Sequence, residues 1–66
     1  MSEEPMLKWF EYEHLPYRLQ AVSVPFHNLA HGMERSVVPG PERTVAFRKL
    51  LEAKDAAVRA TVYPGG

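Results

Sequence analysis

The spacing of hydrophobic residues along the chain predicts two amphipathic helices, the first of which covers residues 16–36. Pro16 suits the first position of a helix, where its missing N–H group costs no hydrogen bond. The apolar positions that follow recur at intervals of three, four and seven residues, as one stripe of a helix requires. This stripe consists of Leu19, Val22, Phe26, Leu29, Ala30 and Met33.

Pro25 lies in the middle of this first helix and opposes its continuity. A proline inside a helix removes one backbone hydrogen bond, and its ring clashes with the preceding turn. The apolar stripe keeps its phase across Pro25, which favours one kinked helix. The alternative is a break at Ser23 and Val24, with Ser23 capping a restarted helix.

A second helix is predicted from Pro41 to about Ala60, after the turn dipeptide Pro39-Gly40. Pro41 again suits the first helical position, and the second half of the segment is rich in strong helix formers. Its larger apolar residues form one stripe, and its alanines form a second face that a neighbouring helix can approach closely. The stripe is Phe47, Leu50, Leu51, Val58 and Val62, and the alanines are Ala46, Ala53, Ala57 and Ala60.

Two helices of similar length joined by a short turn predict an all-α fold, an antiparallel two-helix hairpin. The hairpin domain spans residues 9–62 and begins with a short aromatic arm. Residues 1–8 and 63–66 are expected to be flexible tails. The arm carries Trp9, Phe10 and Tyr12, which are candidates both for core anchors and for groups that stack on nucleobases.

The length of 66 residues limits what such a hairpin can bury by itself. A chain of this size buries only about 60% of its unfolded surface, and small domains usually add disulfides, a metal or oligomerisation. The chain has no cysteine, which excludes disulfides and thiolate metal sites. We therefore expect a dimer or a trimer of dimers to complete the core, with any ligand pocket between chains.

The chain has eight basic and eight acidic residues, so it lacks the basic excess that a general nucleic-acid binder needs. The acidic excess lies in residues 1–15 and the basic excess in residues 16–66, which leaves local cationic sites for a small anion. No apolar run approaches the length of a membrane span. The acidic start of the chain does not resemble a signal peptide, so we expect a soluble intracellular protein that binds neither DNA nor membranes.

Catalytic and metal-binding patterns are weak in this sequence. His27 and His31 have helical i, i+4 spacing, but a zinc enzyme needs three protein ligands and usually a general base, and no HExxH pattern is present. We interpret these two residues and His14 as surface or interface histidines and expect no metal. Ser23 and Ser36 lie in no recognisable nucleophile motif, and the sequence predicts no cofactor and no enzymatic activity.

Arg43 and Thr44 are candidate anion-binding residues because they lie in the first turn of the second helix. Free N–H groups and the helix dipole favour a phosphate there, and an arginine adds a bidentate grip. The alternative is ordinary helix capping with an exposed arginine. Arg48 is a further ligand-binding candidate. The cations farther along this helix have a competing interpretation, in which they form ion pairs on solvent-exposed faces. The cations are Arg48, Lys49, Lys54 and Arg59, and their acidic partners are Glu52 and Asp55.

Three segments resemble a family of very short phage and prophage hairpin proteins: residues 10–16, residues 25–30 and residues 41–60. This family includes the second type of phage anti-CBASS protein and the related Thoeris anti-defence sponge. The resemblance covers residues 9–62. Its most specific part is the last segment, with its Pro-Glu-Arg-Thr opening and its Arg-Lys-Leu-Leu-Glu-Ala continuation.

The resemblance implies a protein that works without catalysis. Members of the family interlock as dimers and often assemble as hexamers, in the cytoplasm of the infected bacterium. They sequester the cyclic di- or trinucleotides, or the cyclic ADP-ribose isomers, that bacterial immune enzymes produce. The alternatives are a small helical inhibitor that docks on a host protein and, lowest in rank, an uncharacterised enzyme subunit.

The resemblance also assigns roles to individual residues. Tyr12 matches an aromatic residue that stacks on a nucleobase, just before the first long helix. His27 falls near a position that is often lysine in the family and would contact phosphate. Arg43 and Thr44 match a basic and hydroxyl pair that lines a separate trinucleotide site, where several subunits meet.

Overall fold

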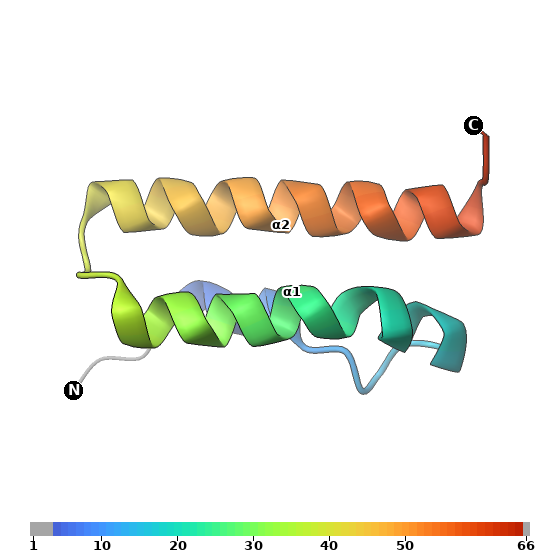
Figure 1. Cartoon of the computed structure of the whole chain (residues 1–66), viewed down its shortest axis with the longest axis horizontal. Helices are drawn as coiled ribbons and strands as arrows, with labels where there is room; N and C mark the ends of the chain where they lie inside the picture. Colours follow the sequence, from blue (N-terminus) through green and yellow to red (C-terminus); the bar gives the residue numbers. More distant parts are fainter. Residues whose placement is uncertain (1–3, 66) are drawn as a thin grey trace.

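The computed structural model describes residues 4–65 and contains three helical elements. The 3-10 helix η1 covers Pro5–Phe10, and the α-helices α1 and α2 cover Tyr17–Ser36 and Pro41–Val62. The two α-helices run antiparallel, joined by a loop over residues 37–40, and η1 lies behind α1 in the view of Figure 1. The predicted two-helix architecture is therefore confirmed for the described residues.

Helix α1 continues through Pro25, so the prediction of one helix is confirmed and the alternative restart at Ser23 is wrong. Pro16 is the N-cap of α1 rather than its first residue. Its carbonyl oxygen accepts hydrogen bonds from the backbone N–H groups of Leu19 and Gln20. Pro16 therefore takes part in α1 as its N-cap, through its carbonyl oxygen, and not as the first helical residue that the sequence predicted.

The buried face of α1 differs from the predicted apolar stripe at two positions, Ser23 and Leu29. Leu19, Ser23 and Ala30 are buried, whereas Leu29 is 53% exposed. Ser23 and Ala30 lie within about 40° of Leu19 around the helix, and Leu29 lies about 80° away in the other direction. The contact face is centred on these positions, which leaves Leu29 at its edge.

The core is small and includes one residue from each element. Phe10 of η1, Ala30 of α1 and Phe47 of α2 form a fully buried cluster. The two phenylalanine rings meet edge to face, with centroids 6.2 Å apart, and the small side chain of Ala30 leaves room for them. Further apolar residues pack around this cluster while partly exposed: Met6, Leu7, Phe26, Met33, Leu50 and Leu51.

The N-terminal arm, defined here as residues 4–16, begins earlier than predicted and contains the helix η1. Residues 4–8 were expected to belong to a flexible tail, but η1 begins at Pro5 and Glu4 is its N-cap. Met6 and Leu7 pack against the core, and this burial explains why the segment is helical. Residues 1–3 of the predicted tail lie outside the described residues, as does Gly66 at the other end.

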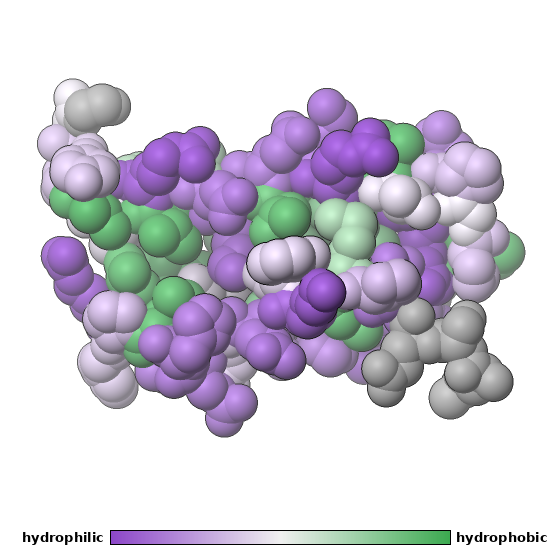
Figure 2. All heavy atoms as spheres, turned by 180° about the vertical axis from the view of Figure 1, so that it is seen from behind, coloured by the Kyte–Doolittle hydropathy of each residue, from purple (hydrophilic) through white to green (hydrophobic). Residues whose placement is uncertain are grey.

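The molecule exposes more surface than a compact protein of its mass. Its principal dimensions are 38 × 22 × 15 Å. The chain exposes 4793 Å², whereas a compact monomer of this mass exposes about 4,250 Å². Hydrophobic side chains reach the surface among polar ones in Figure 2, mainly toward the end of the molecule where the C-terminus lies. The large exposed hydrophobic residues are Trp9, Tyr17, Leu29, Val37, Val38 and Tyr63.

The alanine face of α2 is also open within the chain. Ala53 and Ala60 are exposed, and Ala46 and Ala57 are half-buried. A search of the described helices for a segment of membrane-spanning length and hydropathy found none.

Ser23 is fully buried, and its hydroxyl oxygen has no hydrogen-bond partner among the described residues. We expect Ser23→Ala to raise the free energy of unfolding by about 1 kcal/mol, because it removes a desolvated polar group that gains no bond. Urea unfolding followed by circular dichroism measures this change. The control is Ser36→Ala, since the exposed Ser36 hydroxyl donates to the Gly32 carbonyl at 2.8 Å. A Ser23→Ala variant less stable than wild type would contradict the prediction.

Candidate functional site

The structure brings two of the predicted ligand-binding residues into contact. Tyr12 lies in the arm and His27 on α1, and their rings meet edge to face with centroids 5.0 Å apart. His31 follows one helical turn later, with its ring centroid 4.3 Å from that of His27. All three side chains are half-buried. We call Tyr12, His27 and His31 the ring cluster.

The arm fixes the orientation of His27. The Nδ1 atom of His27 lies 3.2 Å from the carbonyl oxygen of Phe10. A carbonyl oxygen can only accept a hydrogen bond, so Nδ1 carries the hydrogen and donates it. Phe10 is part of the buried core, which holds this carbonyl in place. The imidazole of His27 therefore keeps its second nitrogen, Nε2, for another partner.

A cleft of about 800 Å³ lies against the ring cluster, and its walls are acidic. His27 and His31 line it together with Lys8 and the four carboxylate residues Glu4, Glu11, Glu13 and Glu34. Such an excess of negative charge attracts cations and opposes anions. A phosphate bound at His27 would consequently need positive charge from outside this cleft.

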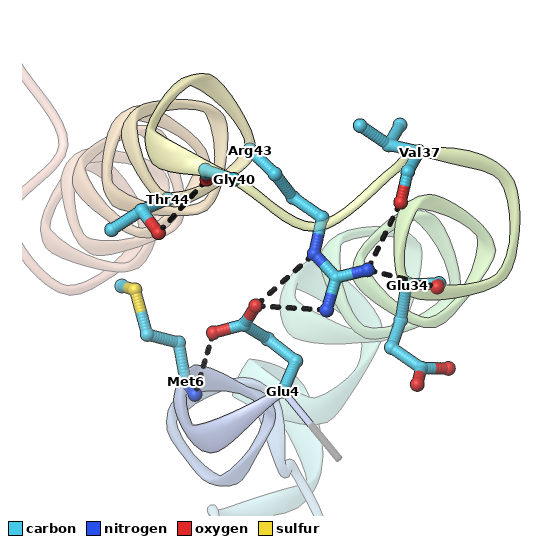
Figure 3. A network of polar contacts seen from close by, with 7 residues as sticks. All are labelled: Glu4, Met6, Glu34, Val37, Gly40, Arg43 and Thr44. Atoms are coloured by element: carbon cyan, nitrogen blue, oxygen red, sulfur yellow. Dashed lines mark hydrogen bonds and ion pairs between the residues drawn. The ribbon is translucent and has the colours of Figure 1, made fainter. Parts of the chain in front are cut away.

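Arg43 is at the centre of a buried polar network, which Figure 3 shows. Its Nε and Nη2 atoms donate to Glu4 Oε1 at 3.2 and 3.1 Å. Its Nη1 atom donates to the backbone carbonyls of Glu34 and Val37 at 3.2 and 3.0 Å. The side chains of Arg43 and Glu4 are only 6% and 9% exposed. The interpretation of Arg43 as an exposed capping residue is therefore wrong.

This network changes what the start of α2 can offer to an anion. Thr44 Oγ1 donates to the Gly40 carbonyl at 3.3 Å, within its own first turn. The carboxylate of Glu4 already occupies the side of the guanidinium that would grip a phosphate bidentately. An external phosphate at Arg43 would have to displace Glu4. Arg48, one turn farther along α2, is exposed.

Lys54 has a structural role that differs from the one predicted from the sequence. It was expected on an ion-paired solvent face, but it is only 8% exposed. Its Nζ atom donates to the backbone carbonyl of Trp9 at 2.6 Å and lies 5.9 Å from the centroid of the Phe10 ring. The predicted pattern holds instead for Lys49 and Glu52, an exposed pair 3.8 Å apart.

A sequence signal for these buried cations exists. Arg43, Phe47 and Lys54 lie within about 40° of one another around α2, and all three are buried. Arg43 binds the N-cap residue of η1, and Lys54 binds a carbonyl at its last turn. We call these two contacts, Arg43 with Glu4 and Lys54 with the Trp9 carbonyl, the arm clamp. The sequence signal for the arm clamp is that Arg43 and Lys54 lie on the same side of α2 as the apolar residue Phe47.

Within residues 4–65, no group of three or more potential metal ligands is gathered closely enough to hold an ion. His14, the third histidine considered from the sequence, is exposed in the arm.

Comparisons with known protein families, with curated proteins and with solved structures found no match to this chain.

Removing Arg43 tests whether this residue is structural. We expect Arg43→Ala to lower the free energy of unfolding by about 3–5 kcal/mol, because it leaves the Glu4 carboxylate buried without a partner. The control is Arg48→Ala, an exposed arginine on the same helix, which should change stability by no more than about 0.5 kcal/mol. Denaturant unfolding measures both. Equal effects of the two substitutions would show that the network contributes no stability.

Removing Lys54 tests the other half of the arm clamp. We expect Lys54→Ala to destabilise the fold by about 1–3 kcal/mol, because the Trp9 carbonyl loses its charged donor. Lys49→Ala is the matched control, since Lys49 is exposed on the same helix. Hydrogen exchange at the amides of η1 should rise with Lys54→Ala and stay unchanged with Lys49→Ala. Unchanged exchange in both variants would contradict the clamp.

Proposed function

We propose that this protein is a phage or prophage anti-defence sponge, which binds cyclic nucleotide immune messengers and sequesters them without cleaving them. The ligands are cyclic di- or trinucleotides or cyclic ADP-ribose isomers, met in the cytoplasm of the infected bacterium. The resemblance of residues 9–62 to the anti-CBASS and Thoeris anti-defence hairpins supports this proposal.

The observation that carries the proposal is the contact between Tyr12 and His27, whose ring centroids are 5.0 Å apart. An accessible aromatic ring stacks on a nucleobase without regard to its identity. The Nε2 atom of His27 is left for a polar group of the ligand, since Nδ1 already donates to Phe10. Tyr12 can therefore stack on one base and His27 can form one polar contact with the ligand, both on the same side of α1.

The phosphates of the ligand need cations, and we assign these to a second copy of the chain. The cleft beside the ring cluster is acidic, so the counter-charge has to come from elsewhere. Arg18, Arg48 and Arg59 are exposed and are the candidates for this role in a second copy. The large exposed surface of the hairpin supports a dimer, and a trimer of dimers follows from the family resemblance.

A separate trinucleotide site at Arg43 and Thr44 is compatible with this proposal under one condition. The ligand phosphate must take the place of the Glu4 carboxylate at the guanidinium. Such an exchange would also release the start of the arm. Ligand binding at this end and loss of the contact between Arg43 and Glu4 would therefore occur together.

The exposed aromatic residues favour a second candidate function, binding to a host protein. Trp9 is 55% exposed and Tyr17 is 88% exposed. Aromatic residues of this kind are enriched at the energetic centres of protein interfaces. In this alternative the hairpin is a small inhibitor module and has no nucleotide ligand.

A panel of cyclic dinucleotides, cyclic trinucleotides and cyclic ADP-ribose isomers tests the proposal. We expect at least one ligand to raise the melting temperature, to bind by calorimetry and to be recovered unmodified after denaturation of the protein. Tyr12→Ala should weaken that binding about 5- to 150-fold, the range for the loss of one stacked base, whereas Tyr12→Phe should retain it.

Two outcomes separate the alternatives. No binding across the whole panel would overturn the sponge and favour the protein-binding module. Recovery of cleaved ligand would indicate an enzyme. Native mass spectrometry of the same sample gives the number of chains and ligands in the complex.

A further inference from the structure

We propose that His27 and His31 form a site for one divalent transition-metal ion, held by two imidazole nitrogens with water in the remaining positions. The ion is of the zinc, nickel or copper class. This site lies within a single chain and does not depend on the proposed function.

The two rings are neighbours on α1 and lie close enough to share one metal ion. His27 and His31 are four residues apart on the continuous helix α1, so both project from one face. Their ring centroids are 4.3 Å apart and their planes are inclined by 46°. Two nitrogens bound to one tetrahedral zinc ion lie about 3.3 Å apart, given bond lengths near 2.0–2.1 Å. Rotation of the His31 side chain would bring the nitrogens to this separation, while the hydrogen bond to the Phe10 carbonyl holds His27 in place.

The hydrogen bond of His27 is the second, independent observation. A metal-binding histidine almost always donates its other ring N–H to a carbonyl or carboxylate, which fixes the tautomer and the orientation of the ring. His27 Nδ1 makes such a bond to the Phe10 carbonyl at 3.2 Å. Phe10 is fully buried, so this outer partner is rigid. The imidazole is therefore prepared to bind a metal through Nε2.

The charge around the pair favours a cation. Apart from the two histidines, Lys8 is the single basic residue among those that line the adjoining cleft, which also includes four glutamates. Glu4 is neutralised by Arg43, and Glu11, Glu13 and Glu34 keep the cleft acidic. These carboxylates are not gathered with the histidines as ligands in the described structure, so they attract the ion while water completes its coordination.

Imidazole nitrogen selects the class of metal. Zinc, nickel and copper ions bind imidazole well, whereas magnesium and calcium prefer oxygen ligands. Affinity should follow the general order for first-row metals, with copper tighter than nickel and zinc. Magnesium and calcium should not bind the pair.

Occupation of the site would use the Nε2 atom of His27 that otherwise remains for a polar group of the nucleotide, and it would change the chemistry of the acidic cleft. The ion adds two positive charges beside Tyr12 and offers exchangeable water positions. A phosphate oxygen of a bound nucleotide could replace one of these waters. This last consequence rests on the proposed function, whereas the metal site itself does not.

The test uses the full chain without an affinity tag, after removal of metals by chelation. Zn²⁺, Ni²⁺ and Cu²⁺ are titrated by calorimetry and by NMR of the imidazole signals, with Mg²⁺ as the oxygen-preferring comparison. We expect one ion per chain, with the largest signal changes at His27 and His31. His27→Gln and His31→Gln should each weaken binding 10-fold or more, and His14→Gln, the control, should leave it unchanged.

Two results would overturn the metal site. The first is no binding of any of the three transition metals at millimolar concentration. The second is a His14→Gln variant that loses as much affinity as His27→Gln, since this would indicate unspecific binding. Circular dichroism of each variant verifies that it is folded. A repeat of the nucleotide panel with Zn²⁺ and with chelator separates the two proposals, because metal binding without nucleotide binding would leave the site standing and refute the sponge.

Discussion

Two buried cations of α2 hold the arm against the hairpin, and both the core and the ring cluster depend on them. Arg43 binds Glu4 at the start of η1, and Lys54 binds the Trp9 carbonyl near its end. Between these anchors, Phe10 enters the core and presents its carbonyl to His27. Buried charges are rare in proteins and need partners. Here the partners belong to the arm, so the same contacts stabilise the fold and orient a candidate ligand-binding side chain.

The helices could be predicted from the sequence because their signals are long and local. The apolar period across Pro25 correctly indicated one helix, and Pro41 marked the first residue of α2. The arm could not be predicted in the same way. Helix η1 has only six residues, too few for a period to be recognised, and its stabilising contacts come from Arg43 and Lys54, far along the chain. A search for periodicity detects neither.

The candidate site was predictable only in part, for a chemical reason. The resemblance predicts Tyr12 and His27 as ligand contacts, and the structure places their rings in contact. Arg43 is predicted to bind an anion, and it does bind one, but this anion is the carboxylate of Glu4 within the same chain. A guanidinium at the start of a helix gives the same sequence pattern whether its partner is a phosphate or an internal glutamate. Only the position of the arm distinguishes the two.

The arm also determines the order in which this protein can fold during synthesis. The arm contacts join residues that are 39 and 45 positions apart, whereas the two α-helices are joined by the short loop at residues 37–40. Local contacts form quickly, and distant ones require closure of a long loop. The ribosome releases the arm before α2, the helix that the arm binds. Until Lys54 has left the ribosome, the Trp9 carbonyl lacks its donor and Phe10 lacks part of its packing surface, so apolar groups of the nascent arm stay exposed.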